Sequence, residues 1–192
     1  MKWVVLAIIL VIVPYTFLTL HYRRPGKAFE PYHDMKDRAN TMRLLSAGFQ
    51  RVSLDAERPA DPPRGLSPAA TLPARGGLPD ALDTTLVDKP LLPVDIATVS
   101  AAGTASAAFS YPIAFTCTLP DNQEQFAGAA LYARGEQIYV VPALEKLAGG
   151  LMTRTRENLI RLTVPAGALK PGTYRVTLLG SRLSKAWDLQ VH

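Results

Sequence analysis

The stretch Phe109–Leu119, FSYPIAFTCTL, decides the fold, because an apolar side chain occupies every second position along it. Strict alternation of this kind is typical of a β-strand with one buried face. Pro112 lacks a backbone donor, which indicates an edge strand or a bulge at that point. The sequence therefore predicts that the C-terminal part of the chain is built from strands.

Outward from this strand, the alternation recurs along the chain. Residues 129–141, AALYARGEQIYVV, predict a hairpin that turns at 134–136. Further strands are predicted at Ile160–Val164, Tyr174–Leu178 and Trp187–Val191, with weaker runs at 83–88 and 94–99. About seven strands separated by frequent turn signals predict a mainly β domain, an antiparallel β-sandwich over residues 81–192.

The N-terminus carries a long apolar run, WVVLAIILVIVPYTFLTL at residues 3–20, without one charge. As a helix it would extend ~27 Å, close to a hydrocarbon core of ~30 Å. No A-x-A cleavage site follows, which favours a retained anchor over a cleaved signal peptide. Trp3 and Tyr22 flank the run as interfacial aromatic residues do. We predict one transmembrane helix, in a single-pass protein of the bacterial inner membrane.

The excess positive charge lies beside this run. The net charge is +5, and residues 21–51 hold seven basic against three acidic side chains. A nucleic-acid binder would carry its positive patch on the folded domain, so that partner is not expected. We expect Arg23, Arg24 and Lys27 to contact anionic lipid headgroups. The positive-inside rule favours a cytoplasmic domain, but long domains translocate regardless of such charges, and we favour the extracytoplasmic side.

Two segments join the run to the strands. Within a basic neck at 21–51, an amphipathic helix is predicted over 34–47, begun by Asp34 and stopped near Gly48. Its apolar stripe comprises Met35, Ala39, Met42, Leu45 and Phe49. This stripe either lies on a membrane or partner, or packs on the chain's own domain, and both interpretations stay open. Residues 52–80 are rich in proline and predict a stiff linker.

The stretch LKPGTY at 169–174, where a turn enters a strand, resembles the late turn of immunoglobulin-like and fibronectin-III-like modules. The resemblance implies that Tyr174 stabilises a corner of a sandwich. An N-terminal anchor followed by Gly172-x-Tyr174 and Trp187-x-Leu189 is also similar in layout to the FixH-type membrane proteins. That family accompanies the assembly of bacterial haem-copper oxidases, so the similarity implies an accessory role.

Motifs for chemistry are missing from the sequence. No two of His21, His33 and His192 are two, three or four residues apart, so the local spacing that places two imidazoles on one metal ion is absent. No nucleophile elbow and no phosphate-binding loop occurs, and carboxylates such as Glu124 are assigned to solvated turns and loops. Cys117, the only cysteine, shares the apolar side of its strand, which predicts a buried structural thiol. We therefore predict no catalytic, cofactor-binding or metal-binding residue, and a protein that is not an enzyme.

Binding is the remaining class of function. Tyr132 and Tyr139 flank the hairpin tip and are predicted to be an exposed aromatic pair. Together with Met35, Met42, Leu45 and Phe49 they are the candidate contacts for a partner. The leading hypothesis is a membrane-anchored accessory module that binds a protein partner in the membrane and helps to assemble a membrane complex. The alternative is copper delivery to a respiratory oxidase, with Cys117, a methionine or a histidine as soft ligand.

Overall fold

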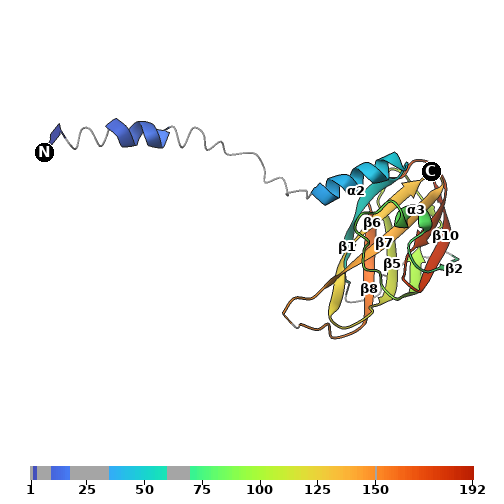
Figure 1. The fold of residues 1–192 in the computed structure, drawn as a ribbon. Helices are drawn as coiled ribbons and strands as arrows, with labels where there is room; N and C mark the ends of the chain where they lie inside the picture. Colours follow the sequence, from blue (N-terminus) through green and yellow to red (C-terminus); the bar gives the residue numbers. More distant parts are fainter. Residues whose placement is uncertain (1, 4–9, 18–34, 60–69, 150) are drawn as a thin grey trace. The chain divides into compact units, whose positions relative to one another are not determined.

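The computed structural model describes residues 2–3, 10–17, 35–59, 70–149 and 151–192 (Figure 1). The chain divides into two units, Met1–Asp34 and Met35–His192. In the first unit the described residues are helical, and the longer segment, 10–17, rises only ~12 Å. The rest of this unit, including residues 4–9 and 18–34, lies outside the described residues.

Among the described residues, no helix is long and apolar enough to cross a membrane. This finding overturns the transmembrane helix predicted over residues 3–20. The single-pass topology and the inner-membrane location rested on that helix and are corrected with it. The helical stretches that the structure describes here, 2–3 and 10–17, are shorter than the ~20 apolar residues of a spanning helix.

The second unit is mainly β, with ten strands and two short helices in its described part. In chain order the elements are α2 Met35–Ser46, β1 Gln50–Glu57, β2 Leu72–Arg75, α3 Asp80–Asp83, β3 Asp95–Ala101, β4 Thr104–Ala105, β5 Tyr111–Thr118, β6 Glu124–Arg134, β7 Gln137–Lys146, β8 Glu157–Val164, β9 Gly172–Leu178 and β10 Leu183–Val191.

Eight of these strands form one closed barrel. Their order is β10-β3-β5-β8-β1-β6-β7-β9, and β9 pairs again with β10. Seven residue pairs join β10 to β9, whereas a single pair, Leu183 with Asp95, joins β10 to β3. The predicted sandwich is therefore wrong. Both architectures bury alternate residues, so the sequence pattern did not distinguish two packed sheets from one closed sheet.

The strand that decides the fold is β5, between β3 and β8. Its pairing with β3 stops at Ile113, so Pro112 has a paired neighbour only on β8. The missing donor of Pro112 is thus tolerated at a local edge inside the barrel. The hairpin predicted over 129–141 is β6–β7, in which Arg134 pairs with Gln137 and Gly135 adopts φ of 59°.

The barrel interior is a tightly packed apolar core. Phe115, Ile160 and Trp187 are almost completely buried there, and its centre leaves no space for a water molecule. Trp187 Nε1 donates a hydrogen bond to Tyr111 Oη at 3.2 Å, and that hydroxyl donates to Ala102 O at 2.6 Å. The two polar groups inside this part of the core are therefore both satisfied.

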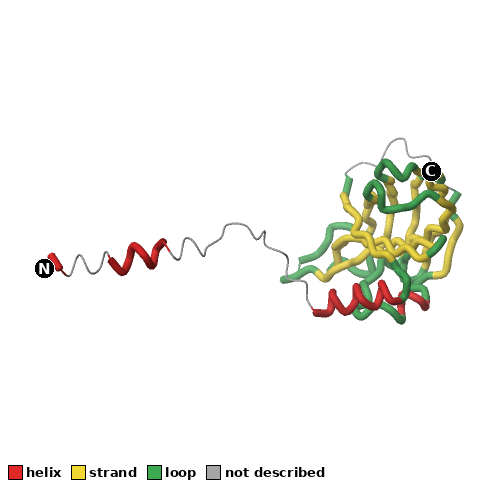
Figure 2. The backbone as a smooth tube through the Cα atoms, turned by 90° about the horizontal axis from the view of Figure 1, so that it is seen from above, coloured by secondary structure: helices red, strands yellow, loops and turns green. Residues whose placement is uncertain are grey.

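A second, smaller core lies outside the barrel. Helices α2 and α3 cover the outer face of β6 and β7, and Figure 2 shows α2 alongside the strands. Leu44 of α2 and Phe49 are each 1% exposed in this core. Asn40 Oδ1 accepts a hydrogen bond from Val87 N at 3.2 Å, and the Arg134 guanidinium lies 4.7 Å from the Phe49 ring centre. The outer core fixes α2 on the barrel.

Part of the segment predicted as neck and linker is structured. Residues 50–57 form β1, which pairs with both β6 and β8, and residues 72–75 form β2 beside β10. Only Leu54 of β1 is buried, so its sequence shows little alternation. Residues 60–69 lie outside the described part of the chain.

Substitutions of the adjacent residues Leu44 and Leu45 test the packing of the outer core. Leu44 is 1% exposed and Leu45 is 62% exposed. Leu44→Ala should lower the free energy of unfolding by about 2 to 4 kcal/mol, because it leaves a cavity under α2. Leu45→Ala should change it by less than about 0.5 kcal/mol. Urea denaturation monitored by circular dichroism measures both; equal losses would show that α2 does not pack as described.

Candidate functional site

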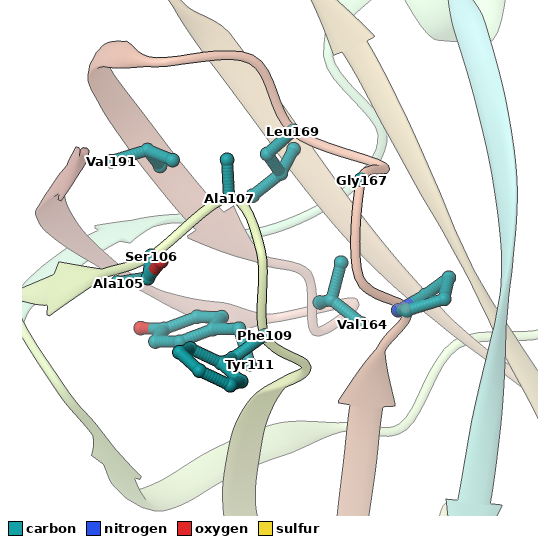
Figure 3. Close-up of a pocket in the computed structure, with 10 residues that line it drawn as sticks. Ala105, Ser106, Ala107, Phe109, Tyr111, Val164, Gly167, Leu169 and Val191 are labelled. Carbon is teal, nitrogen blue, oxygen red and sulfur yellow. The ribbon is translucent and has the colours of Figure 1, made fainter.

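One end of the barrel is closed. Here β5 begins, β10 ends, and the connections at 102–110 and 165–171 fold over the core (Figure 3). Backbone bonds tie them together, since Gly167 N donates to Ala107 O and Ala107 N to His192 O. The cavity beneath has a volume of only about 10 Å³, about one water molecule. This capped end has no room for a ligand.

Tyr174 lies near the capped end, at the start of β9. Its hydroxyl donates to Lys170 O at 2.9 Å. The bond lies within the LKPGTY turn, and the surrounding strands close into a barrel and not into the sandwich that the resemblance implied. A tyrosine corner therefore describes a turn and does not define the fold around it.

The opposite end, which we call the loop end, carries an open hollow. It lies where the connection at 119–123 meets the connection at 147–156. Its volume is about 580 Å³, and it is wide open to solvent. The lining residues are Asn122, Arg154, Thr155, Arg156 and Glu157. The capped end is thus closed, whereas the loop end carries an open hollow.

Hydrogen bonds hold the two connections of the loop end in place. Arg156 donates from Nε and Nη2 to Leu119 O, at 3.1 and 3.0 Å, and from Nη2 to Pro120 O at 2.7 Å. Thr153 N donates to Asn122 O at 2.7 Å. Arg154 is exposed and has no hydrogen bond or ion pair within the described ranges. Arg156 therefore holds the two connections together, whereas Arg154 makes no hydrogen bond or ion pair with the described residues.

A polar layer faces inward at the loop end. Strand alternation places Cys117 of β5, Asn158 of β8 and Glu124 of β6 on the inner side of their strands. Arg58, which follows β1, is exposed. Arg58 donates to Phe126 O at 2.8 Å. Glu124 Oε2 and Asn158 Nδ2 are buried without a hydrogen-bond partner. This layer is the one place in the described core where side-chain polar atoms are left unsatisfied.

Cys117 is fully buried in this layer, as the sequence predicted. Burial raises the pKa of its thiol to about 12, against the smaller opposite effect of the Arg58 charge. His21 and His33 lie outside the described residues, and His192 ends the chain at the capped end. In the described segments, no three His, Cys, Asp or Glu side chains are grouped to hold a metal ion.

The residues predicted to bind a partner fall into two groups. Met42 and Leu45 are 69% and 62% exposed on α2. Phe49 and Tyr132 are buried in the outer core, and Tyr139 is half-buried there, with its hydroxyl donating to Gln137 Oε1. The prediction of an exposed tyrosine pair therefore does not match the structure. Met35 begins α2, but its side chain lies outside what the structure describes.

The predicted lipid contacts lie mostly outside the structure. Trp3 is helical and 84% exposed. Tyr22, Arg23, Arg24 and Lys27 lie outside the described residues. Their contact with anionic headgroups stays a prediction.

Sequence reasoning missed the loop end. Arg154, Glu124 and Asn158 carry no motif, and the assignment of Glu124 to a solvated loop is wrong, because its side chain is buried. One signal was available for Asn158, since it occupies the inward phase of the strand that carries Ile160, Leu162 and Val164. A polar residue in the apolar phase of a strand departs from the local pattern, and such departures are common at functional sites.

No protein-family model, curated protein or solved structure matches this chain.

The buried thiol gives a prediction about pH. Because the thiol pKa is about 12 in the folded protein and 9.0 is its ordinary value, the unfolded chain loses this proton first as the pH rises. Stability must therefore fall above pH 9. Between pH 8 and pH 10 the wild type should lose about 1 kcal/mol more than Cys117→Ala. Urea titrations at both pH values measure this, and parallel losses in the two proteins would contradict it.

Proposed function

We propose that the protein is a binding module that recruits a protein partner through the outward face of α2, and that it serves as an accessory and not as an enzyme. The supporting observation is the exposure of Met42 and Leu45 on a helix whose opposite face is packed. Residues three apart lie next to each other on a helix surface. The two apolar side chains form one ridge, with Arg38 one turn before Met42.

The helix is prepared for binding because its own position is fixed. Leu44 packs in the outer core, and Asn40 accepts a hydrogen bond from Val87. A partner that covers the ridge does not have to order the helix first, so less conformational entropy is lost on binding. An apolar ridge at helical spacing fits a hydrophobic groove, which is a common mode of recognition between proteins.

Copper delivery has no observation in its favour in the described part of the chain. The only thiol is buried, Met42 of α2 is exposed, and the described residues hold no group of three His, Cys, Asp or Glu side chains that could bind a metal ion. It stays an untested alternative.

The test uses photo-crosslinking in cells of the source organism with full-length protein. A benzophenone amino acid replaces Met42 in one protein and Asp55, an exposed residue of β1, in the control. We expect one defined protein adduct from position 42 and none from position 55. Once the partner is purified, Met42→Glu with Leu45→Glu should weaken binding at least tenfold, because two apolar anchors are lost. Equal adducts at both positions, or unchanged affinity, would refute the proposed surface.

A further inference from the structure

The exposed part of α2 carries two arginines beside the apolar ridge of Met42 and Leu45. Arg38 and Arg43 are both exposed. Neither guanidinium has a hydrogen bond or an ion pair within the described residues. The side chains of α2 that the structure describes, at 38–46, include no acidic one. This part of the helix surface is therefore both apolar and positively charged.

Two further arginines lie where α2 leads into β1. The exposed Arg134 places its guanidinium 4.7 Å from the ring centre of Phe49, and Phe49 N donates to Leu44 O of α2. Arg51 is exposed on β1, close enough to Tyr132 that its charge lowers the pKa of that hydroxyl, against the larger opposite effect of burial. In the described ranges neither arginine pairs with a carboxylate. The positive charge thus continues from α2 onto the neighbouring strands.

Helix stability accounts for some of these charges and not for Arg38. Arg43 lies in the last turn of α2, where a cation is favourable beside the negative end of the helix dipole, and Arg134 stacks on Phe49. Arg38 is the fourth residue of α2, near the positive end of the dipole, where a cation is unfavourable. Its charge is therefore not explained by the stability of α2.

The spacing along the helix places both arginines at the border of the ridge. Arg38 comes four residues before Met42, so it extends the line of the ridge toward the N-terminal end of α2. Arg43 directly follows Met42, and successive residues of a helix are turned by about 100°, so it lies to one side of the ridge. A surface that covers Met42 and Leu45 therefore also meets the two guanidinium groups.

Resting on the proposed function of the α2 ridge, we infer that its partner is a protein whose apolar groove is bordered by carboxylates. Met42 and Leu45 enter the groove, and Arg38 and Arg43 pair with aspartate or glutamate side chains at its border. A guanidinium offers a planar fork of donors that matches a carboxylate. The apolar contacts hold the complex together, while the border charges guide association and exclude partners of the wrong charge.

The first test adds charge reversal to photo-crosslinking in cells of the source organism. The probe is full-length protein with the benzophenone amino acid at position 42. Arg38→Glu and Arg43→Glu should each lower the yield of the protein adduct about fivefold, because a glutamate would face carboxylates. Arg154→Glu makes the same charge change at the loop end and should leave the yield unchanged. Equal yields from all four proteins would overturn the acidic border.

The second test detects the carboxylates directly. Arg38→Lys and Arg43→Lys keep the positive charge and supply a primary amine, which a water-soluble carbodiimide condenses with a carboxylate in contact, with loss of water. We expect mass spectrometry to find an amide link from position 38 or 43 to an aspartate or glutamate of the protein that position 42 labels. Arg154→Lys, the matched control, should give no link to that protein. Absence of a link from both helix positions, in cells where the position-42 adduct forms, contradicts the inference.

The outcomes separate this inference from the proposed function. A position-42 protein adduct that depends on neither arginine would refute the acidic border and leave the ridge as a protein-binding surface. Absence of any protein adduct from position 42 would refute both. An adduct with lipid or nucleic acid in place of protein would show that the positive surface meets another anionic partner, and would overturn the inference. Because the arginines are exposed, all variants should retain the circular dichroism spectrum of the wild type.

Discussion

The pairing of β10 with β9 is the interaction on which the rest of the structure depends. Seven residue pairs bring the last strand of the chain beside β9, and β9 in turn pairs in parallel with β7. Without this contact the sheet would end in two open edges. With it, Trp187 and Leu189 point into a closed interior, where Trp187 donates to Tyr111 of β5, two strands away. Closure makes one core out of strands that are distant in sequence.

Because the barrel is closed, it has an outer face, and the outer core covers only part of that face. On β6 and β7 the outer residues Tyr132 and Val141 are apolar and are covered by α2 and α3. Because α2 uses Leu44 and Asn40 for this cover, Met42 and Leu45 are left on its far side. The exposed ridge is therefore a geometric consequence of how the helix packs.

The sequence predicted the features that depend on local pattern, such as β5, the β6–β7 hairpin and the burial of Cys117. It missed β1, because a strand with only Leu54 buried shows no clear period. It misplaced Tyr132, since β6 and β7 are covered on both faces and alternation no longer separates inside from outside there. Closure and the loop end lay beyond any local pattern, because both depend on which strands become neighbours. Only the consecutive order β8-β1-β6 brings Asn158 and Glu124 to one end.

The two ends of the barrel differ in how the inward polar side chains are satisfied. At the capped end the inward polar atoms are paired, since Tyr111 accepts from Trp187 and donates to Ala102. At the loop end Glu124 Oε2 and Asn158 Nδ2 have no hydrogen-bond partner. An unsatisfied buried polar atom costs about 1 to 3 kcal/mol, and apolar residues at these positions would avoid that cost. The same chain satisfies such groups at the capped end, so the two barrel ends differ in how their buried polar atoms are paired.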